Sequence, residues 1–140
     1  MVLLIDTNVL LDVLQEREPY LTDSLTLWGY SEDKIVDGYI SAVSLTNISY
    51  VMRKVLTPDR MQEIFMALAL AFTFVDLKMS DLEAAANMKW RDFEDAVQSA
   101  AASRIHADYI ITRNTKDFQD SPIPALTPEE YLANIFSPKH

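Results

Sequence analysis

An aspartate stands at the end of the most apolar short segment of the chain. Residues 1–5 are all apolar and are followed at once by Asp6. A run this short predicts a strand buried on both faces, as in the centre of a parallel sheet. In open α/β sheets ligands bind beyond the carboxyl ends of such strands. We therefore expect Asp6 to lie at a ligand-binding edge, with Thr7 or Asn8 capping a helix from Val9.

Two further segments carry oxygen-bearing side chains in a comparable context. Asp92 and Asp95 begin an alanine-rich segment that is predicted to be a helix. There they either stabilise the helix N-terminus through their negative charge or belong to a metal site. Asp92, Asp95, Ser99, Ser103 and His106 should form one polar stripe on this helix. After a second buried run at 107–111 come Thr112, Asn114 and Asp117, which also suit a polar turn. If all three segments meet, their carboxylates repel one another unless a cation lies between them.

Composition limits the kind of cation. The chain has no cysteine and two histidines, which disfavours a zinc site. Oxygen ligands favour Mg²⁺ or Mn²⁺. A net charge of −9 in 140 residues argues against a general nucleic-acid binder but allows a metal-dependent nuclease. We expect a cytoplasmic protein without signal peptide or membrane span, because no apolar run is long enough.

Strand and helix patterns alternate along the chain. We predict strands at 2–5, 39–43, 72–77, 107–111 and 125–126, the last a brief edge strand. Helices are predicted at 9–15, 22–35, 44–56, 58–71, 80–89, 93–106 and from 127, with capping by Ser44 and capping boxes at 80–83 and 127–130. This order predicts one α/β domain over 1–136, a three-layer α/β/α fold with a parallel sheet of four to five strands. Residues 137–140 are expected to form a disordered tail.

Four motifs in this order resemble the PIN domain, the metal-dependent ribonuclease fold of VapC-type toxins from toxin–antitoxin pairs. They are residues 4–8, 41–47, 93–96 and 111–118. The resemblance implies catalytic and metal-binding acids at Asp6, Asp95 and Asp117, with Asn114 beside the last and Thr112 near the metal or scissile phosphate. Asn47 stands where the family usually has a glutamate. Either Asp92 compensates as a metal ligand or metal affinity is reduced.

The resemblance also implies RNA cleaved endonucleolytically, a homodimer and a possible antitoxin partner. Side chains expected near the substrate phosphates are Asn8, Arg113, Asn114 and Lys116, with Arg53, Lys54 and Arg91 on segments that bracket the site. Because Asn47 is neutral, a PIN fold that binds RNA or protein without cutting is one alternative. A receiver-like domain is the other, with Asp76 as phosphate acceptor, Thr112 as switch hydroxyl and Lys116 as the lysine.

Overall fold

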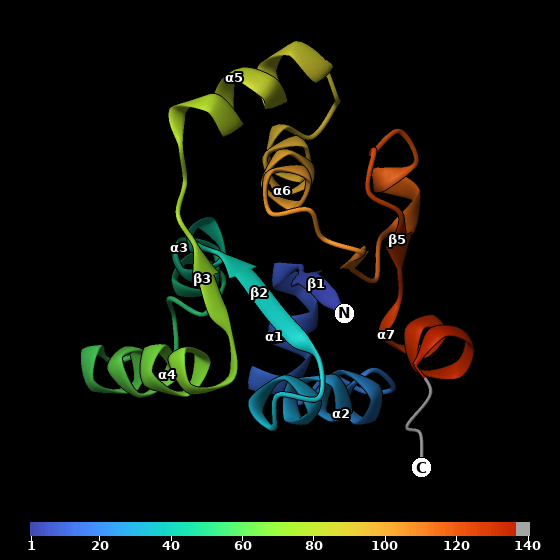
Figure 1. Cartoon of the computed structure of the whole chain (residues 1–140). Coiled ribbons are helices and arrows are strands. Elements are labelled where there is room, and N and C mark those ends of the chain that lie inside the picture. The colour runs from blue at the N-terminus through green and yellow to red at the C-terminus, as the bar shows by residue number, and fades with distance from the viewer. Residues whose placement is uncertain (137–140) are drawn as a thin grey trace.

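The computed structural model describes residues 1–136. Strands and helices alternate along the chain (Figure 1). The elements are β1 (Val2–Ile5), α1 (Thr7–Leu14), α2 (Leu21–Glu32), β2 (Asp37–Ser41), α3 (Ala42–Val51), α4 (Pro58–Ala71), β3 (Thr73–Val75), α5 (Met79–Met88), α6 (Phe93–Arg104), β4 (Tyr109–Ile111), the 3₁₀ helix η1 (Thr115–Phe118), β5 (Ala125–Leu126), α7 (Pro128–Glu130) and the π-helical η2 (Tyr131–Ile135). The tail predicted at 137–140 lies outside the described residues.

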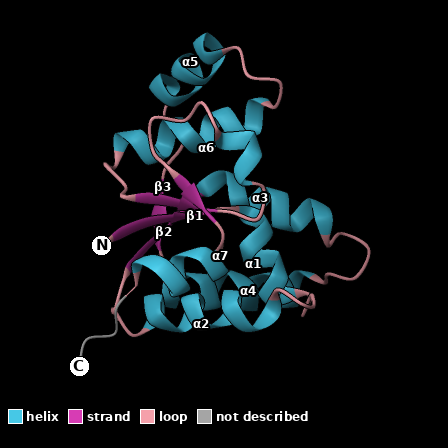
Figure 2. Ribbon diagram, turned by 90° about the vertical axis from the view of Figure 1, so that its right-hand side faces the viewer, coloured by secondary structure: helices cyan, strands magenta, loops and turns pink. Residues whose placement is uncertain are grey.

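The five strands form one parallel sheet in the order β3-β2-β1-β4-β5. Figure 2 shows the sheet edge-on, with α5 and α6 above it and α1, α2 and α4 below. The predicted three-layer α/β/α architecture with a parallel sheet is therefore confirmed. No helix within residues 1–136 is both long enough and apolar enough to cross a bilayer.

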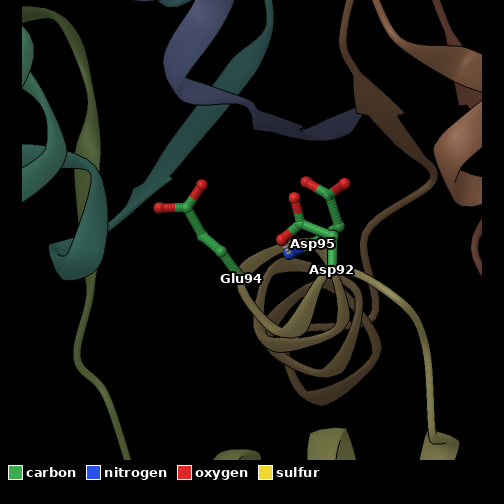
Figure 3. A group of neighbouring side chains, drawn as sticks. All are labelled: Asp92, Glu94 and Asp95. Carbon is green, nitrogen blue, oxygen red and sulfur yellow. Dashed lines mark hydrogen bonds between the residues drawn. The ribbon is translucent and has the colours of Figure 1, made fainter.

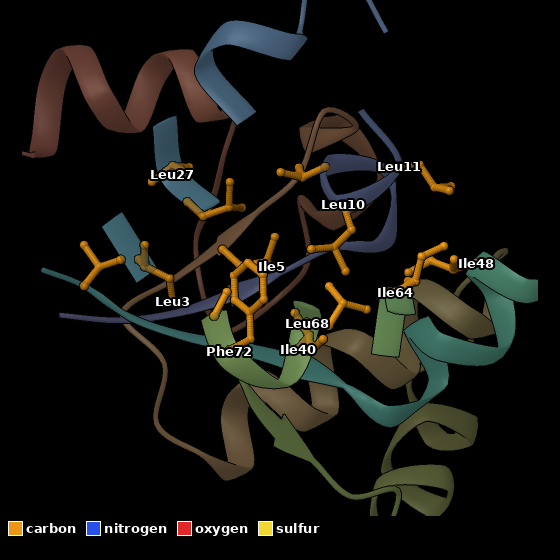
Figure 4. Packing of buried hydrophobic residues seen from close by; sticks show 14 of the residues in the cluster. Leu3, Ile5, Leu10, Leu11, Leu27, Ile40, Ile48, Ile64, Leu68 and Phe72 are labelled. Carbon is orange, nitrogen blue, oxygen red and sulfur yellow. The ribbon is translucent and has the colours of Figure 1, made fainter. Parts of the chain in front are cut away.

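The central strand β1 is buried on both faces, as its sequence predicts. Leu3 and Ile5 join the core cluster below the sheet, which includes Leu10, Leu68 and Phe72 (Figure 4). Leu4 points to the opposite face, where alanines of α6 pack against it. Small side chains allow α6 to lie close to the sheet, which brings its N-terminus to the end of β1.

Three predicted boundaries near the site were wrong. Helix α1 begins at Thr7 with Asp6 itself as N-cap, so neither Thr7 nor Asn8 has that role. Strand β2 begins at Asp37, before the predicted start at residue 39, and Ser41, not Ser44, caps α3. The glycine at 38 is required by packing, because a Cβ there would lie 2.2 Å from the Ser31 Oγ.

Other helix ends also differ from the predictions. Helix α3 stops at Val51, before the predicted end at residue 56, and Val55 beyond it is 73% exposed. The capping box predicted at 80–83 is replaced by a bond from the Lys78 backbone N–H to Asp81. The capping box between Thr127 and Glu130 is confirmed.

Candidate metal and active site

Asp6 lies at the point where β1 meets α1. Its backbone N–H donates to the Ile111 carbonyl at 2.9 Å, which fixes it against the end of β4. Its Oδ1 accepts from the Thr7 N–H at 2.7 Å and so caps the helix. A buried strand leading directly into a helix thus places this carboxylate at the carboxyl edge of the sheet.

The second oxygen of Asp6 is held by side chains from two other segments. The Thr112 hydroxyl donates to Asp6 Oδ2 at 2.8 Å, and Asn8 Nδ2 lies 3.4 Å from the same oxygen. Asn8 in turn accepts from the Arg113 N–H. Asp6 is 6% exposed, and burial raises its pKa to about 6, although the bonds from Thr112 and Thr7 act in the opposite direction.

The N-terminus of α6 contributes three more carboxylates. Asp92 is the N-cap and accepts from the Asp95 N–H at 3.1 Å. Oxygens of Asp92, Glu94 and Asp95 lie within 4.8 Å of one another (Figure 3). Burial, followed by the charges of Asp6, Asp92, Asp117 and Glu94, raises the pKa of Asp95 to about 7. Asp92 is therefore both a helix cap and a member of the acid cluster.

These acids surround one cavity of about 360 Å³, here called the acidic cavity. Its lining comes from β1, α1, α3, α6 and η1, and includes Asp6, Asn8, Asn47, Asp92, Glu94, Asp95, Asn114 and Asp117. Thr112 is fully buried beside it through its bond to Asp6. The structure thus brings together every residue predicted to be catalytic or metal-binding.

Glu94 is a member of the site that sequence reasoning missed. The side chain of Asn47, on α3, donates from Nδ2 to the Glu94 carboxylate across the cavity. Burial and the charge of Asp92 raise the pKa of Glu94, against the lowering effect of the Asn47 bond. Its position in the first turn of a helix capped by Asp92 was the available signal, because that turn faces the ligand-binding edge.

The predicted phosphate-contacting residues are divided among different surroundings. Lys116 and Arg91 line a larger neighbouring cavity of about 1070 Å³, together with Lys89 and the acids of α6. Arg113 is turned away: its Nε donates to the fully buried Asp12, at 3.0 Å to Oδ2, and its guanidinium lies over the Tyr20 ring.

Arg53 and Lys54 line a separate small cavity beyond the end of α3. The Arg53 guanidinium lies over the Tyr50 ring, and Tyr50 also lines the acidic cavity. These two cations therefore border the site from the α3 side without entering it.

The polar stripe predicted on α6 is only partly exposed. Asp92 and Asp95 lie at the site, but Ser99 is fully buried and bonds Ser121 at 2.7 Å. His106 lies beyond the end of the helix. The segment around Ser121 therefore covers the middle of the stripe.

The donor set of the acidic cavity fits a hard divalent cation. Its lining side chains offer carboxylate and amide oxygens, and among the described residues that line it there is no lysine or arginine. Carboxylates that raise one another's pKa values are the arrangement that a bound cation stabilises. Asp6, Asp92, Glu94, Asp95 and Asp117 are the residues that could hold it, with Mg²⁺ or Mn²⁺ the natural match for oxygen ligands.

The protein thus combines a parallel α/β sheet with a cluster of acids at the carboxyl end of its central strand. The model of the PIN domain family matches residues 2–116, which is most of the chain. The protein therefore belongs to the PIN domain family. No curated protein sequence matches it significantly.

Solved structures with the same fold come from toxin–antitoxin systems. A toxin–antitoxin complex from Klebsiella pneumoniae matches with a TM-score of 0.68 at 24% identity, over 89% of this chain and 96% of that chain. VapBC2 from Rickettsia felis, bound to a promoter DNA fragment, gives 0.66 at 15% identity over 91% and 98%. Mycobacterium tuberculosis VapC20, a toxin that cleaves the sarcin–ricin loop, gives 0.62 at 12% over 77% and 86%.

The receiver-like alternative does not fit this fold. Asp76, its phosphate acceptor, follows the edge strand β3, two strands away from β1. Its carboxylate pairs with Arg104 at 3.4 Å, and it is not among the residues lining the acidic cavity. Family membership and the position of Asp76 both count against a phosphoacceptor role.

Proposed function

We propose that this protein is a metal-dependent endoribonuclease that hydrolyses RNA phosphodiester bonds in the acidic cavity. The observation that carries the proposal is the convergence of Asp6, Asp95 and Asp117, from β1, α6 and η1, on one cavity without a lining cation. Nothing in the packing of the fold requires these charges to be together. A bound divalent cation gives the arrangement a function.

The chain's own residues fix the geometry of this site. Thr112 and Asn8 hold Asp6 Oδ2, and the Thr7 N–H holds Oδ1, so the carboxylate has a single orientation. Asp95 and Asp117 approach from the other side of the cavity. When bound, Mg²⁺ or Mn²⁺ supplies a water of lowered pKa and polarises a phosphoryl oxygen.

The neighbouring cavity contains both basic and acidic side chains, the acids being Asp92, Glu94, Asp95, Asp117 and Asp120. Lys89, Arg91 and Lys116 line it next to Asp92 and Asp95. With an overall charge of −9, affinity for phosphates must come from such a local group of cations. We propose that Arg91 and Lys116 hold phosphates that flank the scissile bond, with Asn8 and Asn114 contacting the scissile phosphate.

We further propose that the protein is the toxin of a toxin–antitoxin pair and forms a homodimer. Structural neighbours were solved as toxin–antitoxin complexes. Helices α3 and α4 expose several large apolar side chains, including Tyr50, Phe65, Met66 and Leu70. Exposed apolar side chains of this kind are common at protein interfaces. We propose that the protein acts in the cytoplasm, where its RNA substrate would be found.

The test is cleavage of a mixed pool of RNA oligonucleotides in the presence of Mn²⁺. The unsubstituted protein should cut, and the Asp95→Asn variant and an EDTA-treated sample should not. Glu83→Gln, an exposed acid on α5 that lies outside the cavity, is the matched control and should cut normally. Equal cutting by Asp95→Asn would show that the site is elsewhere.

The same experiment separates the enzyme from a binding module. If RNA is bound but not cut at any Mn²⁺ concentration, the fold serves only to bind. Asn47, which lines the cavity where the family usually has a glutamate, is the reason to keep this alternative. Filter binding of the same RNA pool supplies the second measurement.

A further inference from the structure

Position 47 lies at one side of the acidic cavity and carries no charge. Asn47 is part-buried on α3, directly opposite the N-terminus of α6. Asn47 offers only an amide, so a cation bound near α3 would lack a charged ligand if this helix alone had to provide it. The charge at this side of the cavity has to come from another element.

Glu94 extends from α6 toward Asn47, at the α3 side of the acidic cavity. In Figure 3 its side chain leaves the helix in a different direction from Asp92 and Asp95, toward β2 and α3. Its carboxylate accepts a hydrogen bond from Asn47 Nδ2, a contact between residues 47 positions apart in the chain. The carboxylate of Glu94 therefore lies where a short acid on α3 would place its own oxygens.

We propose that Glu94 is the metal-binding carboxylate for the α3 side of the site, with Asn47 as the residue that positions it. This inference rests on the proposed function, because it assigns a ligand to the same cation. The negative charge on this side of the cavity is then supplied by Glu94 from α6, and not by a residue of α3. Asn47 donates to one oxygen of Glu94 and leaves the other free to face the cavity.

The geometry supports a ligand role more than a surface role for Glu94. An oxygen of Glu94 lies within 4.8 Å of oxygens of both Asp92 and Asp95, which is close enough for one cation to contact all three. No lysine or arginine among the described residues forms an ion pair with it. An acid held this close to two others without a basic partner is stabilised by a shared cation.

Mn²⁺ affinity, measured by isothermal titration calorimetry on the full chain, tests the assignment without reference to catalysis. Glu94→Gln should weaken Mn²⁺ binding by roughly 10- to 100-fold, the range seen when groups around a metal are removed. Asn47→Ala should weaken it by no more than about fivefold, the scale of one hydrogen bond. Glu83→Gln, with the same change of charge, should bind as the unsubstituted protein does.

A double variant that exchanges the side chains at positions 47 and 94 gives the most decisive test. Asn47→Glu combined with Glu94→Gln returns the carboxylate to α3 and places the amide on α6. It should recover most of the affinity that Glu94→Gln alone removes. Circular dichroism of each variant without metal checks that the fold is kept.

Each remaining outcome overturns the inference. If Glu94→Gln binds Mn²⁺ like Glu83→Gln while Asp6→Asn does not bind, the metal site stands and Glu94 is not a ligand. If Asn47→Ala loses as much affinity as Glu94→Gln, the amide is the ligand and Glu94 only orients it. If the unsubstituted protein binds no Mn²⁺, the proposed function fails together with this inference.

Discussion

Replacing Asp6 by Asn is expected to stabilise the metal-free protein at pH 8 and to abolish its stabilisation by Mn²⁺. The carboxylate is 6% exposed, and its pKa rises from 3.8 to about 6 in the fold. At about 1.4 kcal/mol per pH unit, keeping this group ionised costs about 3 kcal/mol at pH 8. An asparagine carries no charge and avoids this cost.

Part of this gain is lost to hydrogen bonding. The Asn oxygen can still accept from the Thr7 N–H, but its NH₂ group then faces the Thr112 hydroxyl. That hydroxyl already lies within hydrogen-bond distance of Asn8 Nδ2 and the Asn114 N–H. Loss of one buried hydrogen bond costs about 1 kcal/mol, so the net gain should be about 1–2 kcal/mol at pH 8.

The sign of the pH dependence follows from the raised pKa. The folded protein holds the Asp6 proton more tightly than the unfolded chain, so this contribution to stability is complete below pH 3.8. It is lost as the pH rises through about 6. Between pH 5 and pH 8 the unsubstituted protein should therefore lose about 1.4 kcal/mol that Asp6→Asn does not lose.

Urea denaturation followed by circular dichroism, in EDTA and at several pH values, measures this difference. Mn²⁺ at about 100 times its dissociation constant should then stabilise the unsubstituted protein by about 2.7 kcal/mol and leave Asp6→Asn unchanged. Stability curves that run parallel from pH 5 to 8 in EDTA would refute the reasoning, because they would show that burial of Asp6 carries no cost.

Three further outcomes are expected. Asp95→Asn should lose the Mn²⁺-dependent rise in melting temperature that Glu83→Gln retains, as measured by differential scanning fluorimetry. Gly38→Ala should destabilise the fold by about 1–3 kcal/mol in urea denaturation, because its Cβ would lie 2.2 Å from the Ser31 Oγ. Arg104→Gln should cost about 3 kcal/mol at pH 7, because it leaves the carboxylate of Asp81, 3% exposed, without its charged partner; an unchanged urea midpoint would contradict this.

The fold was predictable because its main signal is local. Five apolar residues followed by an acid identify a central strand and its carboxyl end, and alanines in α6 indicate close packing on the sheet. Helix starts were harder, since Ser41 and Ser44 are both good caps. Residues 37–38 look like a turn, and only the Ser31 side chain packed over Gly38 explains why a glycine lies inside a strand.

That the predicted acids lie close together could be inferred from the sequence, whereas most of their contacts could not. Spacing along a helix shows which residues share a face, but it does not show what another helix brings to that face. The contact between Asn47 and Glu94 depends on how α3 and α6 meet across the cavity. Arg113 is a similar case, because its neighbour Thr112 lies at the site while its own guanidinium binds Asp12.

The pairing of β1 with β4 sets the order in which the site can be assembled. The Thr112 partner of Asp6 and the Ile111 carbonyl that fixes it lie more than a hundred positions further along the chain, so they are synthesised later. Until that later segment has left the ribosome, β1 lacks β4, one of its two neighbouring strands, and the acidic cavity lacks Asn114 and Asp117 from its lining. The Asp6 carboxylate therefore stays without its Thr112 partner until the segment around β4 has folded against β1.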